Sequence, residues 1–241
     1  MKSAIRSPKS GQTTLVCFAL KEEAAAFRKI SAGRPGVAVL ITGIGQENAK
    51  QLVKDFLVEH APTLVLTCGL AGGLNPDLEL GEVVFELFPT SGRGDEAQTE
   101  IGNRLEPPYV GCYERLITAG AKPARLFCAD RIATKAVDKQ ELRRVTGADA
   151  VEMESKAIHA VCRERRIPCA TVRVISDTAN EDLPLDFNQL AKADLSLDYG
   201  KLALAVAKSP AKISALLRLQ KQTRFAAERL AAVLGKVIWP P

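Results

Sequence analysis

The stretch ADAVEMESKAIHAVCRERRIPCATVRVISD, from Ala148 to Asp177, decides the fold. Apolar residues recur at helical spacing between Ala157 and Cys162, and Pro168 ends that helical segment. The β-branched run that follows, from Cys169 to Ile175, is typical of a strand covered on both faces. A strand, a helix and a second strand in this order predict an α/β fold.

Charged side chains bracket this buried unit. Glu152 and Glu154 precede the helix, Arg173 lies within the second strand, and Asp177 follows it. Charged groups are costly to bury without partners or a purpose. Because open α/β sheets place their ligand crevice at the carboxyl ends of strands, we expect Asp177 to border a binding site.

Strands and helices continue to alternate on both sides of this unit. We expect strands at 13–20, 37–42, 63–67, 81–88, 125–129 and 130–136, and helices after residue 23, after residue 45, and at 139–145, 200–208 and 211–235. The pattern predicts one three-layer α/β/α domain over residues 13–241 with a mixed central sheet, preceded by a flexible tail at 1–12. Residues 89–124 are polar and rich in Gly and Pro, so we expect a lid or excursion there.

Composition excludes several classes of protein. The 241 residues carry a formal net charge of +5 and only 5% are aromatic, so we expect no nucleic-acid platform. The six cysteines form no C-x-x-C pair and the two histidines stand apart, which argues against zinc or a disulfide framework and favours a reducing cytoplasm. The apolar run at 15–20 is too short for a signal peptide, and no stretch is long enough to span a membrane.

Two glycine-rich segments are expected to be loops after strands. Gly43-Ile44-Gly45 precedes a predicted helix, but Asn48 stands where a dinucleotide fingerprint has its third glycine. The loop from Gly69 to Pro76 lacks the Gly-Lys-Ser/Thr of a nucleoside-triphosphate site. Neither segment therefore predicts a nucleotide cofactor.

Four motifs in order along the chain carry a resemblance to a known family. They are Ala19-Leu20-Lys21-Glu22-Glu23, Thr42-Gly43-Ile44-Gly45, Gly69-Leu70-Ala71-Gly72-Gly73, and Glu152-Met153-Glu154 with Arg173 and Ser176-Asp177. Together they resemble the superfamily of nucleoside phosphorylases and 5'-methylthioadenosine/S-adenosylhomocysteine nucleosidases. The resemblance spans Leu15 to Asp177, and it covers residues 89–124 and the last third of the chain poorly.

This resemblance implies cleavage of a purine N-glycosidic bond through an oxocarbenium-like transition state. Asp177 would protonate N7 of the leaving base, which requires a buried site that keeps its carboxyl protonated near neutral pH. Glu23 would activate the attacking water, and Glu154 would hold the 2'- and 3'-hydroxyls of the ribose.

Other positions of the same family pattern are expected to line the site. Met153 would pack under the sugar, while Arg173 and Ser176 would fix the Asp177 carboxylate. The residues expected beside the base and the sugar are Ile132, Ala133, Gly45, Gly69 and Leu70.

Each charged candidate also has an interpretation without a ligand. Glu23 and Glu154 are acids near helix starts, where negative charge suits the helix dipole, and Asp177 could cap a turn. Arg173 could serve only as an ion-pair partner, and that role is the one we expect for Glu152. The family pattern favours the catalytic interpretation of Glu23, Glu154 and Asp177. His159, which has no neighbour at ligand spacing, is expected to be an ordinary histidine.

The nucleophile separates hydrolysis from phosphorolysis. Phosphorylases of the family clamp phosphate with an arginine and a hydroxyl, and this sequence has Thr67 and Leu70 at those positions. Because both donors are lost, water is favoured, with inorganic phosphate as co-substrate in the alternative case. Leu70 also departs from the nucleosidase pattern. The glycine stretch, residues 183–188 and the basic end of the chain resemble hopanoid-associated members, which are thought to remove adenine from an adenosylated lipid.

Three functions therefore stay open. Hydrolysis of a purine nucleoside is favoured over phosphorolysis, including phosphorolysis of an adenosylated hopanoid, and over a non-catalytic nucleoside-binding protein. An aspartate at position 177 favours adenine, by resemblance alone. We expect no cofactor, a small purine nucleoside as partner, and a cytoplasmic homodimer or higher homo-oligomer.

Overall fold

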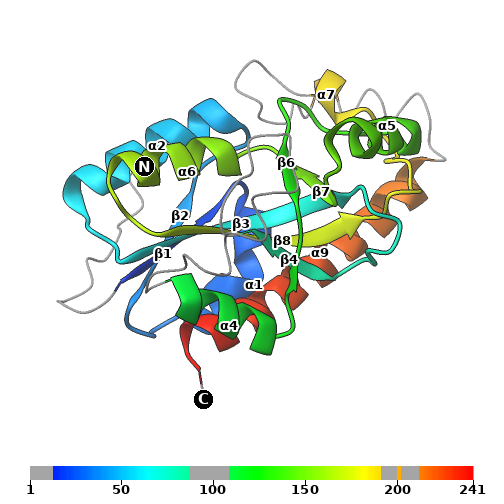
Figure 1. The fold of residues 1–241 in the computed structure, drawn as a ribbon. Coiled ribbons are helices and arrows are strands. Elements are labelled where there is room, and N and C mark those ends of the chain that lie inside the picture. Colours follow the sequence, from blue (N-terminus) through cyan, green and yellow to red (C-terminus); the bar gives the residue numbers. More distant parts are fainter. Residues whose placement is uncertain (1–12, 87–108, 191–199, 202–211, 241) are drawn as a thin grey trace.

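The computed structural model describes residues 13–86, 109–190, 200–201 and 212–240. Within these residues, a mixed sheet of eight strands forms the centre of the protein (Figure 1). The strands are β1 (Thr14–Phe18), β2 (Val37–Ile41), β3 (Leu64–Gly73), β4 (Val83–Glu86), β5 (Lys122–Pro123), β6 (Leu126–Cys128), β7 (Ala150–Glu152) and β8 (Cys169–Asp177). Their order is β2-β1-β3-β8-β4-β5, and β7 pairs with both β3 and β6.

The middle of the sheet is parallel and its flank is antiparallel. Strands β2, β1, β3 and β8 run in one direction, whereas β4 runs antiparallel to β8 and β7 antiparallel to β3. All nine residues of β8 are buried, which accounts for the β-branched run seen in its sequence. The carboxyl ends of the four parallel strands meet at one edge, where a ligand crevice is expected.

Helices cover both faces of this sheet (Figure 1). On one face, α2 and α6 lie side by side over a core that includes Leu15, Val65 and Cys169. On the other face, α1, α4 and α9 pack over Phe18, Leu66 and other core residues. The helices are α1 (Lys21–Ser31), α2 (Gln46–Glu59), α4 (Tyr109–Thr118), α5 (Ala136–Thr146), α6 (Ser155–Glu164), α7 (Phe187–Leu190) and α9 (Lys212–Ile238). The predicted three-layer α/β/α class with a mixed sheet is confirmed.

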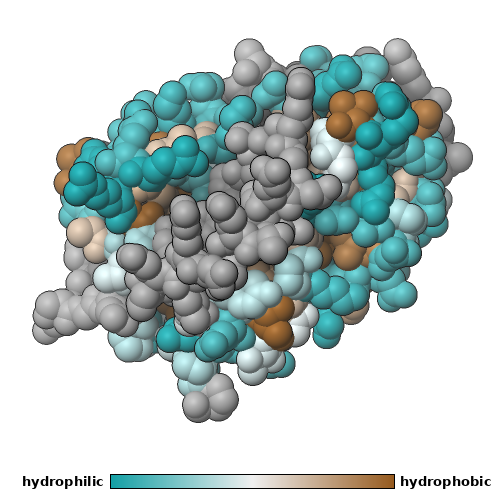
Figure 2. All heavy atoms as spheres, viewed as in Figure 1, coloured by the Kyte–Doolittle hydropathy of each residue, from teal (hydrophilic) through white to brown (hydrophobic). Residues whose placement is uncertain are grey.

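On the face drawn in Figure 2, the described side chains are mostly hydrophilic, and the hydrophobic ones form separate small patches. None of the helices described is both long and apolar enough to cross a membrane.

Two local predictions from the sequence are wrong. The glycines from Gly69 to Gly73 continue β3 instead of forming a loop, because β8 and then β7 pair with this part of the strand. Residues 130–135 connect β6 to α5 and form no strand, and Asp130, Arg131 and Lys135 are exposed there.

The predicted lid at 89–124 is partly described. Its second half contains α4, which packs against α9 through the buried Leu116, and the short strand β5. Neither element was predicted from the sequence. Residues 89–108, the tail at 1–12 and most of the predicted helix at 200–208 lie outside the described residues.

Candidate active site

The candidate site lies at the edge of the sheet where the parallel strands end. Glu23 is in the first turn of α1, which follows β1, and Gly45 immediately precedes α2, which follows β2. Leu70 lies within β3, and Asp177 is the last residue of β8. Motifs that are far apart in the sequence therefore meet at one edge.

Arg173 is at the centre of a buried cluster of carboxylates. Its side chain is 1% exposed, and its Nη2 pairs with Glu152, lies 3.3 Å from Oε2 of Glu154 and donates to Oγ1 of Thr67 at 3.2 Å. This arrangement differs from the expected contact with Asp177. Four residue steps along an extended strand span about 13 Å, too far for the guanidinium to bind the carboxylate at the strand's end.

Glu152 holds the start of helix α6 as well as Arg173. Its carboxylate accepts hydrogen bonds from the backbone N–H groups of Glu154 at 3.0 Å and Ser155 at 2.9 Å, and from the Ser155 hydroxyl at 2.5 Å. Burial opposes the charge of Glu152, but the Arg173 guanidinium and these donors outweigh burial and hold the pKa of Glu152 below its usual range. Its contacts fit the structural role expected for it.

Glu154 is buried between Gly45, in the turn after β2, and Arg173. The backbone N–H of Gly45 donates to its Oε1 at 3.0 Å, and Arg173 lies against its Oε2. Burial raises the pKa of Glu154, and the nearby charge of Glu152 raises it further, against the opposing effect of Arg173. The ionised pair is therefore Glu152 with Arg173, while Glu154 exchanges a proton more readily near neutral pH.

Glu23 is 8% exposed and so is not a solvated acid at a helix start. Its carboxylate accepts from the backbone N–H of Leu20 at 3.0 Å and from that of Leu70 at 3.2 Å. Burial raises the pKa of Glu23, although Arg173 and the two N–H donors act in the opposite direction. A buried carboxylate with a raised pKa is a stronger base than an exposed one.

Gly69 makes room for the meeting of Glu23 and Arg173. A Cβ at this position would lie 2.6 Å from Nη1 of Arg173 and 3.1 Å from Oε2 of Glu23. The absence of a side chain at Gly69 therefore lets the general-base candidate and the carboxylate cluster share one space.

Asp177 is 6% exposed and is held from two sides. The hydroxyl of Ser176 donates to its Oδ1 at 2.8 Å, as expected, while its Oδ2 pairs with the ammonium of Lys139 on α5. The sequence expectation was a carboxyl kept protonated by burial, whereas the structure places a cation against it. Lys139 was missed as a site residue, and its sequence signal was a spacing of three from Ala136 and Leu142, which are both half-buried on the same helix.

Asp177 and the pair of Glu23 and Arg173 border the same stretch of β3. Asp177 approaches Gly72, where a Cβ would lie 3.3 Å from its Oδ2, whereas Glu23 and Arg173 meet over Gly69. Three residue steps along a strand span about 10 Å. Charged groups therefore approach β3 at two positions that lie three residues apart.

The expected base-side residues lie next to this stretch. Ala133 is buried in one apolar cluster with Leu74 and Val151, and a Cβ at Gly72 would lie 3.3 Å from Cγ1 of Val151. Ile132 is half-buried and is held by two hydrogen bonds of 2.9 Å between its backbone and the Asn188 side chain. Met153 is half-buried between Glu152 and Glu154.

His159 is a core histidine, in agreement with its interpretation from the sequence. Its Nε2 lies 2.8 Å from the Thr171 hydroxyl, and burial lowers its pKa to about 4. No group of three or more His, Cys, Asp or Glu side chains in the described parts of the chain could hold a metal ion.

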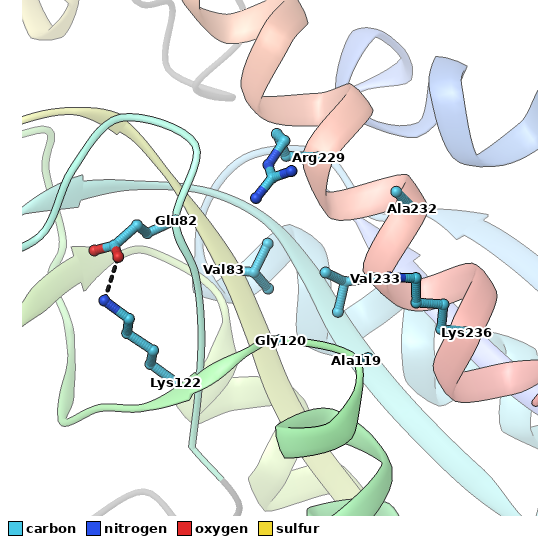
Figure 3. A pocket seen from close by; sticks show the side chains of 9 residues that line it. All are labelled: Glu82, Val83, Ala119, Gly120, Lys122, Arg229, Ala232, Val233 and Lys236. Atoms are coloured by element: carbon cyan, nitrogen blue, oxygen red, sulfur yellow. Dashed lines mark hydrogen bonds and ion pairs between the residues drawn. The ribbon is translucent and has the colours of Figure 1, made fainter.

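A separate cavity of about 160 Å³ lies on the face covered by α9 (Figure 3). Arg229 and Lys236 of α9 border it from one side, and the paired Glu82 and Lys122 from the other. It is lined by none of the candidate residues, so it is not the space between Glu154 and Asp177.

The chain is similar in sequence to known enzymes. Residues 118–208 match the sequence profile of the phosphorylase superfamily. The chain is 30% identical over 179 residues to a 5'-methylthioadenosine/S-adenosylhomocysteine nucleosidase of Shewanella loihica, and the match covers 66% of this chain and 76% of that protein.

Two solved structures share the fold over nearly their whole length. A 5'-methylthioadenosine/S-adenosylhomocysteine nucleosidase from Neisseria meningitidis, in complex with methylthio-immucillin-A, has a TM-score of 0.65 and 19% identity over 94% of this chain and 98% of its own. The futalosine hydrolase of Helicobacter pylori has a TM-score of 0.61 and 17% identity, with coverage of 93% and 98%.

Proposed function

The chain belongs to the phosphorylase superfamily, and from this premise we propose that it is an enzyme that cleaves the N-glycosidic bond of a purine nucleoside with water as the nucleophile. The nucleosidase name of the Shewanella relative supports this activity. The arrangement of Glu23, Glu154 and Asp177 along one stretch of β3 supports it independently.

The proposed roles follow from where each carboxylate lies. Asp177 protonates N7 of the base, and Ser176 keeps its carboxylate oriented. Glu154 accepts hydrogen bonds from the ribose hydroxyls, because each of its oxygens has a second lone pair beyond the one used by Gly45 or Arg173. Glu23 takes a proton from the attacking water.

The remaining candidates shape the pocket around these three. Arg173 fixes Glu154 and lies beside Glu23, so its role is at the sugar end of the site and not at Asp177. Met153 packs under the sugar. The backbone around the sugar comes from Gly45, Gly69 and Leu70, and the base side comes from Ile132 and Ala133.

The charge around Arg173 is the observation that carries the choice of water. Glu23, Glu152 and Glu154 surround one guanidinium, and Thr67, which stands where phosphorylases have an arginine, is itself bonded to Arg173. A phosphate dianion needs cationic donors, and among the described residues around Thr67 the carboxylates already pair with Arg173. The same negative surroundings stabilise the positive charge that develops on the sugar.

Base release with and without phosphate tests this proposal. Purified protein is incubated with adenosine, methylthioadenosine and inosine, and the free base is measured by chromatography. We expect adenine to be released without phosphate and inosine to react more slowly. Strict dependence on phosphate would instead establish a phosphorylase, and no release from any substrate would leave a nucleoside-binding protein.

We also propose that the enzyme works in the cytoplasm as a homo-oligomer. All six cysteines are free thiols, and five are buried, as suits a reducing compartment. Leu52 and Val58 of α2 are exposed apolar side chains that a second copy of the chain would cover. Light scattering after size-exclusion chromatography measures the mass directly, and the mass of a single chain would contradict the proposal.

A further inference from the structure

A buried lysine contacts the carboxylate proposed to protonate the base. Lys139 lies on α5 with 0% of its side chain exposed, and its Nζ pairs with Oδ2 of Asp177. Nζ also donates to the carbonyl oxygens of Thr178 at 2.8 Å and Glu181 at 2.9 Å. An ammonium group has three N–H donors, so every donor of Lys139 is used.

Stability alone does not account for a charge at this position. A buried ion pair gives little net stability relative to apolar side chains of similar volume. Other bonds already tie the segment after Asp177 to α5: Asp182 pairs with Lys135 at 3.0 Å and accepts from the N–H of Ala136 at 2.8 Å, and the N–H of Leu183 donates to Thr134 at 2.9 Å. What Lys139 adds is an ammonium directed at Asp177.

We infer that Lys139 is a positioning residue that acts through Asp177 and stores the proton that the leaving base consumes. This inference rests on the proposed function. The ammonium and the Ser176 hydroxyl hold the two oxygens of Asp177, so the carboxyl group keeps one orientation toward the base. Lys139 itself is fully covered and does not touch the substrate.

The proton that reaches the leaving base starts on Lys139. A proton moves from Nζ of Lys139 to the Asp177 carboxylate, and the N–H electron pair stays on the neutral amine. Asp177 gives a proton to N7 of the purine, and the C1'–N9 bond breaks with its electrons going to the base. The water oxygen bonds to C1' and its proton goes to Glu23. Solvent then protonates Lys139 and deprotonates Glu23, so one water is consumed.

Charged groups face Lys139 from β8, from the segment that follows β8 and from its own helix. Asp177 faces it from β8, and Glu181 and Asp182 lie in the segment that follows. Glu181 is itself bonded to Arg218 and Gln222 of α9. Lys135 is the residue before α5 and Asp138 is in its first turn, and Arg143 farther along α5 is paired with Asp149. The carboxylate in direct contact is that of Asp177.

The pH profile of Lys139→Met tests the inference. A lysine ammonium ordinarily keeps its proton to about pH 10, whereas an aspartic acid ordinarily loses it near about pH 4. We expect wild-type kcat to persist at pH 9. In the variant, the ratio of kcat at pH 9 to kcat at pH 6 should fall by about tenfold or more, with KM nearly unchanged because Glu154 is intact.

The matched control is Lys135→Met on the same helix terminus, since Lys135 is exposed and pairs with Asp182 instead of Asp177. It should leave the profile unchanged. If Lys139→Met does not fold, Lys139→Gln keeps amide donors for the carbonyls of Thr178 and Glu181 and should show the same loss at high pH. The pH profile of the wild type is itself a test. If kcat already falls with rising pH before pH 7 is reached, the inference is overturned.

The proposed function and the role of Lys139 are contradicted by different results. A wild-type protein that releases no base from any nucleoside removes the proposed function. An active wild type whose Lys139→Met and Lys139→Gln variants lose the same fraction of kcat at every pH removes only the inference, since that result describes a structural lysine.

Discussion

Replacing Glu152 by glutamine removes one buried charge while keeping the shape of the side chain. In Glu152→Gln, the amide oxygen can take the place of Oε2 and keep the bonds from Arg173 and from the N–H groups of Glu154 and Ser155. The amide nitrogen can donate to the Ser155 hydroxyl, which now accepts. The change therefore isolates the charge of Glu152 from its hydrogen bonds.

The expected cost follows from the burial of both partners. Arg173 is 1% exposed and the Glu152 side chain 0%, and removal of one partner of such a pair costs about 3–5 kcal/mol. Glu154 can ionise and take over part of the pairing, so we expect the lower end, about 3 kcal/mol. For a chain of this size, that free energy corresponds to a fall in Tm of roughly 6–12 °C.

Thermal unfolding followed by far-UV circular dichroism at pH 7.5 measures this change. Glu141→Gln is the control, because Glu141 pairs with Arg144 on the surface of α5 and should leave Tm unchanged. Arg173→Met combined with Glu152→Gln should cost less than the sum of the two single changes, since each single change leaves the partner's charge buried and unpaired and the double change removes both charges. A Tm for Glu152→Gln within 2 °C of wild type would refute the idea that Glu152 carries the charge opposite Arg173.

Three further changes test the proposed site and its surroundings. Asp177→Asn should lower kcat by about 10²–10⁴-fold in the base-release assay, and an unchanged rate would remove Asp177 from the mechanism. Burial raises the pKa of Glu23, so wild-type kcat should fall on the acid side at a pH above the ordinary 4.5 of a glutamate, and Glu23→Gln should abolish that fall along with most activity. Burial also raises the pKa of Glu86 to about 8, so its contribution to stability is complete below about pH 4.5 and is lost as the pH rises through 8. Glu86→Gln should therefore gain in Tm over wild type between pH 5 and pH 9, and a constant difference would contradict this.

Periodicity and strand-end chemistry predicted the three-layer fold because each main element has its own local signal. The buried strand β8 holds a β-branched run between Thr171 and Ile175, and α6 shows a clear apolar face and ends before Pro168. The glycines of β3 misled because glycine ordinarily marks a turn. Here Gly69 and Gly72 are in a strand whose neighbours need the space that side chains would fill.

The partners of the charged residues were beyond a reading of the sequence. Arg173 and Asp177 belong to one strand, and the family resemblance implied a contact between them that extended geometry forbids. Lys139 reaches Asp177 from a helix 38 residues earlier, through a packing arrangement that no local pattern encodes. Motif order located the carboxylates and Arg173, whereas Lys139 and the pairing of each charged group came from tertiary structure.

Arg173 and Lys139 lie at the two ends of the site, and the charge at each end suits the bond that the enzyme is proposed to break. At the sugar end, Glu23, Glu152 and Glu154 surround Arg173, so carboxyl groups outnumber cations there among the residues that the structure describes. At the base end, Asp177 is paired with the ammonium of Lys139. Heterolysis of an N-glycosidic bond moves positive charge onto the sugar and negative charge onto the base. Fixed groups of this polarity stabilise the transition state relative to the ground state without reorganisation. Charges placed the other way round would raise the barrier to cleavage.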